Sequence, residues 1–127
     1  MSHFSHIKTR IQNIEYLEKA LNQLCISYKT KNEKIKGYQN KVSEVNLSIP
    51  QSNGYDIGFN WNGKEYELIT DLSFWQQKWS VETFMDKLSQ AYASETILHE
   101  SSKQGFQKIK QSIDIDGSVT LILERWK

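Results

Sequence analysis

The stretch YDIGFNWNGKEYELITD, residues 55–71, predicts a β-hairpin. On both sides of Asn62-Gly63, apolar side chains alternate with polar or small ones, which is typical of strands that bury one face. Asn-Gly is the preferred pair for a two-residue type I′ turn, because both residues tolerate positive φ. That turn would pair Phe59 with Tyr66, so that apolar side chains meet across the ladder. We therefore expect an antiparallel sheet built around this hairpin.

Two amphipathic helices are predicted, one on each side of the hairpin in the sequence. The first covers residues 13–25, where Asn13 is a good N-cap and apolar residues follow at helical spacing. The second covers residues 80–104, with Ser80 as its N-cap and Gly105 as its C-terminal stop. Each helix carries a single apolar stripe, so each needs one surface to cover.

Extended segments account for the rest of the chain: a first strand around Ile7, residues 26–50 with a turn near Gly37, and a C-terminal hairpin around Gly117. In the last hairpin, a three-residue loop ending at Gly117 would pair Ile113 with Val119 and Lys108 with Glu124. This register keeps apolar residues on one face, which a two-residue loop would not.

The elements follow in the order β-α-β-β-β-α-β-β. An antiparallel sheet offers both helices a surface, so the expected fold is α+β, a two-layer sandwich of ferredoxin-like type with both helices on one face. The length of 127 residues fits one domain with a core of its own, so residues 1–127 are expected to form a single domain.

Composition favours an ordinary globular protein in a reducing compartment. The chain is 38% hydrophobic and 24% charged, which argues against disorder. The single cysteine, Cys25, excludes an internal disulfide and is expected to be a small buried hydrophobe. No apolar run reaches the roughly 20 residues that span a bilayer, and the first residues lack the apolar core of a secretory signal.

Residues 71–84, DLSFWQQKWSVETF, contain two tryptophans just before the second helix. Trp79 precedes the N-cap, where it can pack on Phe84 as a hydrophobic staple. Trp75 and the two glutamines after it form the better candidate for a contact surface, since aromatic residues are enriched at binding hot spots. Packing at the rim of the core is the other interpretation of Trp75. The candidate partner-binding residues are Trp61, Trp75, Gln76, Gln77 and Trp79.

Positive charge gathers in the first part of the chain. Residues 1–50 hold 8 Lys/Arg against 4 Asp/Glu, whereas residues 51–127 hold 8 against 11. The excess forms a candidate basic patch of Lys29, Lys31, Lys34, Lys36 and Lys41. This patch could attract a phosphate backbone. A solvated edge strand, where lysines deter edge-to-edge pairing, is the favoured interpretation, because no arginine or interleaved aromatic run accompanies the lysines.

The sequence carries no catalytic motif. It has no Gly-rich phosphate loop, Walker motif, CxxC pair, HExxH or nucleophile elbow. The carboxylates Glu65, Glu67 and Asp71 share a strand face, and the strand alternation explains them as solvated. His3 and His6 would face opposite sides of a strand and so would not chelate a metal together. We expect no catalytic residue, no metal and no cofactor, and an enzyme is the less favoured interpretation.

The segments MSHFSHIKTRI, YDIGFNWNGKEYELITDLSFWQQKWSVETFMDKLSQAYA and LILERW together resemble the hypothetical chloroplast reading frame thirty-five family. This is a family of unknown function, found in plastid genomes and cyanobacteria. The resemblance covers essentially the whole chain, with residues 29–53 matching less distinctively. It implies a location in the plastid stroma or the cyanobacterial cytoplasm, and it supplies no catalytic residue to carry over.

The leading hypothesis is a non-enzymatic accessory or binding protein. It would dock on a protein partner, in the assembly or regulation of a photosynthetic complex, through its tryptophans. One alternative is a nucleic-acid-binding module that uses the lysines between Lys29 and Lys41, a less favoured partner class. Another is a regulatory domain that binds a small ligand. No membrane span is expected, and peripheral membrane association stays open.

Overall fold

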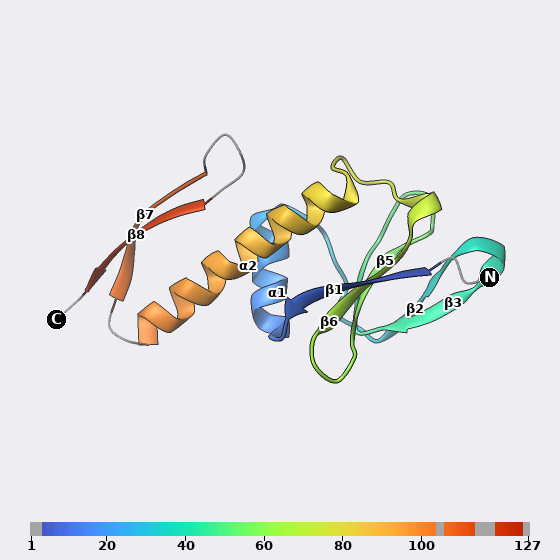
Figure 1. The fold of residues 1–127 in the computed structure, drawn as a ribbon, viewed down its shortest axis with the longest axis horizontal. Coiled ribbons are helices and arrows are strands. Elements are labelled where there is room, and N and C mark those ends of the chain that lie inside the picture. The colour runs from blue at the N-terminus through green and yellow to red at the C-terminus, as the bar shows by residue number, and fades with distance from the viewer. Residues whose placement is uncertain (1–3, 104–105, 114–118, 126–127) are drawn as a thin grey trace.

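The computed structural model describes residues 4–103, 106–113 and 119–125, and it confirms the α+β class (Figure 1). In chain order, the helices and strands are β1 Phe4–Ile11, α1 Ile14–Gln23, β2 Glu33–Lys36, β3 Val42–Val45, β4 Leu47–Ile49, β5 Ile57–Trp61, β6 Tyr66–Asp71, α2 Val81–Lys103, β7 Phe106–Ile113 and β8 Val119–Arg125. Two 3₁₀ turns, η1 Tyr38–Asn40 and η2 Leu72–Phe74, follow β2 and β6. Within the described ranges, no helix has the length and apolar character needed to cross a membrane.

The main sheet has four antiparallel strands in the order β1-β6-β5-β4. Strand β1 alternates as predicted, with Thr9 and Ile11 buried and Lys8 exposed. The strand ends with a bulge, where the register shifts between Lys8 and Ile11 and Arg10 has a φ of 63°. β2 and β3 form a second sheet of their own, and β7 and β8 a third.

Both helices cover the same face of the main sheet, as predicted. Leu17 and Leu21 of α1 and Phe84 and Leu88 of α2 are fully buried in one cluster with Phe59 of β5. Complete burial of such a side chain stabilises the fold by about 1.5–3 kcal/mol. This shared core fixes the two helices against the sheet and against each other.

The opposite face of the sheet is partly covered by the β2–β3 hairpin, which adds a layer to the predicted two. Ile35 of β2 and Val45 of β3 are buried against Ile69, with Phe4 packed beside them. The close approach requires a glycine, because a Cβ atom on Gly58 would lie 2.2 Å from Cγ1 of Val45. The sheet therefore does not present an open outer face for binding over its whole area.

The central hairpin forms as predicted, but its predicted register is wrong. Trp61 pairs with Tyr66 and Phe59 with Leu68, so the connection is longer than two residues. The Asn62 side chain explains the difference, because its Oδ1 accepts hydrogen bonds from the backbone N–H groups of Lys64 and Glu65, both at 2.9 Å. Asn side chains commonly build such local turns. The shift is two residues, so each side chain keeps its predicted face.

The helix starts agree with the sequence, whereas the end of α1 does not. Asn13 caps α1, since its Oδ1 accepts from the backbone N–H groups of Glu15 and Tyr16. Ser80 caps α2, since its Oγ accepts from Thr83 N at 3.2 Å. Cys25 is exposed rather than buried, and it has a φ of 58°. It occupies the left-handed position that closes a Schellman motif, a place where glycine is usual.

The ferredoxin-like variant is not confirmed. The order β1-β6-β5 has the first strand beside the last strand before α2, as in that fold. The strands after α2 form the separate β7–β8 sheet instead of extending the main sheet past β1. In that hairpin Ile113 pairs with Val119 as predicted, but a register shift places Gln107, not Lys108, opposite Glu124. The predicted turn at Gly117 and the helix stop at Gly105 lie outside the described residues.

Candidate functional site

Trp75 is integrated into the fold. It is half-buried, and its ring meets that of Phe84 edge to face, with centroids 5.2 Å apart. Its indole N–H donates to the carbonyl of Trp79 at 2.8 Å. The indole N–H thus has its acceptor within the chain, and the ring packs on another aromatic ring of the chain. These contacts assign Trp75 a structural role at the rim of the core.

The two glutamines after Trp75 are bound to a buried side chain, Gln51. The Oε1 atom of Gln51 accepts from Gln76 N at 2.8 Å and from Gln77 Nε2 at 2.9 Å. Its Nε2 donates to the carbonyls of Tyr55 and Phe74. Gln51 is only 8% exposed, so it acts as a clamp between two loops. Trp75, Gln76 and Gln77 thus lie together, and the two glutamines are bound to this internal side chain.

Trp79 is half-buried against the core and holds two cations over its ring. The Lys78 ammonium lies 4.4 Å from the ring centroid, and that of Lys87 lies 5.1 Å away. Cation–π contacts of this kind contribute about 0.5–1 kcal/mol at exposed sites. The ring contact to Phe84 is made by Trp75, so the predicted staple between Trp79 and Phe84 stays a prediction.

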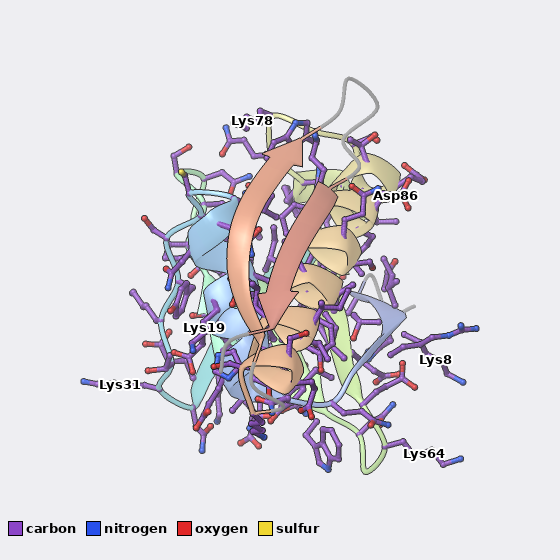
Figure 2. All side chains as sticks on the ribbon, turned by 90° about the vertical axis from the view of Figure 1, so that its left-hand side faces the viewer. Lys8, Lys19, Lys31, Lys64, Lys78 and Asp86 are labelled. Carbon is purple, nitrogen blue, oxygen red and sulfur yellow. The ribbon has the colours of Figure 1, made fainter. Side chains whose placement is uncertain are left out.

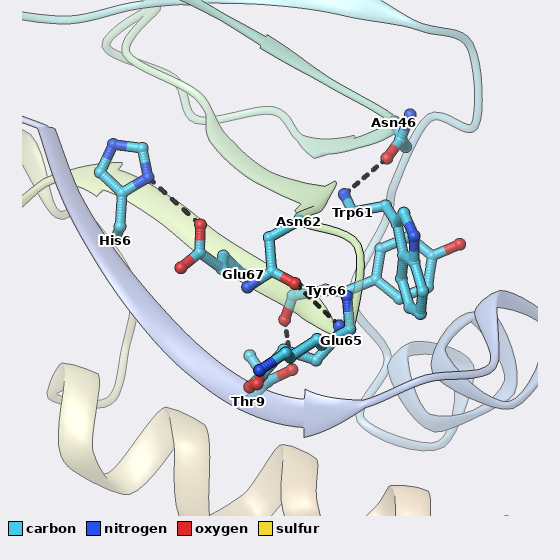
Figure 3. A network of polar contacts seen from close by, with 9 residues as sticks. His6, Thr9, Asn46, Trp61, Asn62, Glu65, Tyr66 and Glu67 are labelled. Carbon is cyan, nitrogen blue, oxygen red and sulfur yellow. Dashed lines mark hydrogen bonds and ion pairs between the residues drawn. The ribbon is translucent and has the colours of Figure 1, made fainter.

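Trp61 differs from these two tryptophans. It lies at the end of β5 with 42% of its surface exposed, and its ring packs on Tyr66 at a centroid distance of 5.0 Å and an angle of 60°. Asn46 Oδ1 accepts from the Trp61 backbone N–H at 2.8 Å, which fixes the residue (Figure 3). Across the residues that the structure describes, the Trp61 indole N–H has no acceptor.

A depression of about 450 Å³ adjoins Trp61. Its lining is uncharged and combines aromatic, amide, hydroxyl and aliphatic side chains: Gln12, Ile14, Thr30, Asn32, Asn46, Trp61 and Tyr66. Concave sites lined by aromatic groups with a few polar atoms are the usual form of binding sites. The sequence pointed to Trp61 alone among these lining residues. The lining comes from five separate segments, which share no spacing pattern.

The outer edge of the same hairpin is held by polar contacts to β1, several of which are drawn in Figure 3. Glu65 Oε1 accepts from the backbone N–H of Arg10 at 2.8 Å, and His6 Nδ1 lies 3.6 Å from Glu67 Oε1. Thr9 Oγ1 donates to the Tyr66 carbonyl. These bonds hold β6 and the turn that follows Trp61 against β1.

The predicted basic patch divides into two places. Lys29 and Lys31 line an open groove of about 1010 Å³ beside the end of α1. The remaining lysines belong to the β2–β3 hairpin and its turn, and every lysine of the patch is exposed. Glu44 is the register partner of Lys34 across that hairpin. Lys29 and Lys31 thus belong to a segment separate from the hairpin that carries the other three lysines.

The acids and histidines are dispersed. Glu65, Glu67 and Asp71 bind backbone or histidine groups of their own neighbourhood, and Asp71 is buried, where it accepts from Ser73 N and Tyr38 N. Among the described residues, no group of three or more His, Cys, Asp or Glu side chains could hold a metal ion. The geometry of Trp61 and its depression supports binding; it does not assemble an acid and a base around a shared point.

Comparison with known proteins supplies a family. The family model described as "Protein of unknown function (DUF1257)" matches residues 20–122. The chain is 46% identical over 127 residues to "Uncharacterized protein ycf35" of Guillardia theta, covering 100% of this chain and 99% of the relative. It is 52% identical over 122 residues to the protein of that name from Trieres chinensis, covering 94% of each, and 42% identical over 127 residues to that of Cyanophora paradoxa, covering 100% and 99%.

No solved structure shows a significant match to the chain. The relatives are plastid-encoded hypothetical reading frames without a named catalytic activity. Their identity extends over the full length of the chain, as the resemblance in the sequence implied. The chain therefore belongs to the DUF1257 family of unknown function, together with the ycf35 proteins.

Proposed function

We propose that this chain is a non-enzymatic accessory protein that docks on a protein partner through Trp61. The observation that carries the proposal is the exposed indole: 42% of the residue is accessible, and its N–H has no acceptor in the described part of the chain. Large aromatic side chains of this kind dominate the energetics of protein interfaces. A partner side chain or backbone carbonyl would complete the hydrogen bond and cover the ring.

The support beneath Trp61 favours recognition. Tyr66 packs on one side of the ring, and Asn46 anchors the backbone. A hot spot that is already held in place loses less conformational entropy on binding, which raises affinity. The uncharged depression beside it gives the partner a second point of contact. Trp75 and Trp79 contribute indirectly, because they stabilise the entry to α2.

The expected partner is a component of a photosynthetic complex, encountered in the plastid stroma or its cyanobacterial counterpart. The plastid-encoded family supports the plastid location. The docking role would then be in assembly or regulation rather than in the chemical reactions of the complex.

Site-specific photo-crosslinking in the source organism tests the proposal. A benzophenone amino acid replaces Thr30, an exposed residue that lines the depression beside Trp61, in one strain and Ile97, an exposed residue of α2, in a control strain. We expect one discrete crosslinked protein with the probe at position 30 and not at position 97. Equal crosslinking from both positions, or none from position 30, would contradict the proposal.

A further inference from the structure

Exposed apolar side chains gather at the turn between β2 and β3. Val42 is 60% exposed and Tyr38 is 42% exposed, and Leu72 at the end of β6 is 49% exposed. The backbone N–H of Tyr38 donates to Asp71 Oδ2 at 2.9 Å, which brings the turn next to Leu72. Three of the five large hydrophobic side chains that are exposed in the described part of the chain thus lie at one end of the molecule.

The same turn is strongly basic. Residues 34–42 contain three lysines and no acidic residue, and Lys34, Lys36 and Lys41 are all exposed. The nearest buried acid, Asp71, has its oxygens directed to two backbone N–H groups. In the register of the hairpin Lys34 lies opposite Glu44, whereas Lys36 lies opposite Val42.

The basic side chains extend beyond the turn toward η2. The Lys36 ammonium lies 4.9 Å from the centroid of the Tyr55 ring, which stacks on Phe74 at 3.7 Å. We name the combined area, Lys34, Lys36, Tyr38, Lys41, Val42 and Leu72, the hairpin tip surface. In Figure 1 the β2–β3 turn projects at the end of the molecule opposite the C-terminal hairpin.

We propose that the hairpin tip surface docks on an anionic lipid surface. Val42 and Leu72 would enter the headgroup region, while the lysines contact anionic headgroups. A projecting tip that combines apolar and basic side chains suits a flat anionic bilayer surface. Lysine is depleted in protein–protein interfaces, so a surface whose only cations are lysines fits lipid better than an acidic protein.

The proposal is independent of the Trp61 site. Trp61 pairs with Tyr66 at the start of β6, whereas the hairpin tip surface adjoins the end of β6 at Asp71. The protein could therefore bind a lipid surface and a protein partner at the same time. Each contact can be removed without touching the residues of the other.

Vesicle co-sedimentation of the full chain tests the proposal. The probes are vesicles of equal parts phosphatidylglycerol and phosphatidylcholine, compared with pure phosphatidylcholine. We expect binding to the anionic vesicles only, weakening as salt is raised. Lys36→Gln with Lys41→Gln should lower the partition coefficient roughly 25-fold, since each lysine near an anionic surface contributes about fivefold. Val42→Asn should lower it at unchanged charge.

A matched control separates the tip from general charge attraction. Lys8 and Lys64 are exposed and point away from the ribbon (Figure 2), and Lys8→Gln with Lys64→Gln changes the net charge by the same amount. This pair should change the partition less than about twofold. An equal loss in both double variants, or no preference for anionic vesicles, would overturn the proposal. Binding of an acidic protein without any binding of vesicles would overturn it as well.

A fluorescent label places the contact. An environment-sensitive dye on Val42→Cys, in a Cys25→Ser background, should shift to shorter wavelength with anionic vesicles. The same dye on Lys64→Cys should not shift. A shift at position 64 and none at position 42 would also overturn the proposal.

Discussion

The indole N–H of Trp75 donates to the backbone carbonyl of Trp79, and this bond of 2.8 Å closes the segment that leads into α2. The two tryptophans therefore fix each other, and Trp75 also meets Phe84 edge to face. Together the contacts set the path of the chain from the sheet to the helix. Of the three tryptophans in the described ranges, Trp61 at the end of β5 is the most exposed.

Trp75→Phe should destabilise the protein, because it removes that hydrogen bond and part of the contact with Phe84. We expect a loss of about 1–2 kcal/mol in the free energy of unfolding. Urea unfolding followed by circular dichroism measures it. Trp61→Phe is the matched control and should change stability by less than about 0.5 kcal/mol. Equal losses in the two variants would contradict the structural role of Trp75.

Gln51→Leu should cost about 2–4 kcal/mol of stability, because it leaves the carbonyl of Tyr55 and the N–H of Gln76 without their partner. It also removes one of the two hydrogen bonds to the carbonyl of Phe74, which Asn53 still binds. The substitution keeps the side chain's approximate size, so the loss reports on hydrogen bonding. Gln77→Leu removes a single bond to the same atom and is the control, with an expected loss below about 1 kcal/mol. Similar effects of both changes would argue against a central clamp at Gln51.

Gly58→Ala should destabilise by about 1–3 kcal/mol, because the new methyl group would overlap Val45, whose Cγ1 lies 2.2 Å from the Cβ position. The β2–β3 hairpin would have to move away from the sheet. Adding Val45→Ala makes room, so the double variant should lose less than the sum of the two single losses. A double-mutant cycle measured by thermal unfolding decides this. Simple additivity would show that the hairpin does not press on Gly58.

Cys25→Gly should stabilise the protein by about 0.5–1 kcal/mol, since a φ of 58° is strained for a residue with a side chain. Cys25→Ala keeps the strain and should leave stability nearly unchanged. Both are read from the midpoint of urea unfolding. A loss of stability on introducing glycine would contradict the left-handed cap at the end of α1.

Local features of this fold could be predicted from the sequence. Asn13 and Ser80 cap the helices because capping depends on residues only a few positions apart. The faces of the central hairpin follow from its alternation. Its register could not be predicted, because the amide of Asn62 competes with the backbone for the N–H groups of the turn.

Long-range features could not be predicted. The packing of Val45 on Gly58 depends on a contact between strands that the sequence does not connect by any pattern. In the sequence Gln51 looks like an ordinary loop residue. In the fold its side chain accepts hydrogen bonds from Gln76 and Gln77, which lie in another loop. The sequence singled out Trp61 and Trp75 alike, and the structure distinguishes them by burial, since Trp61 is exposed and Trp75 is half-buried.

The affinity of the purified partner for Trp61→Ala tests the central claim most directly. Isothermal titration should show at least about a tenfold loss relative to the unaltered chain, the effect of removing a buried aromatic anchor. Ile97→Ala, a change at an equally exposed position on α2, should leave the affinity unchanged. A folded Trp61→Ala protein that binds as tightly as the unaltered chain would contradict the account.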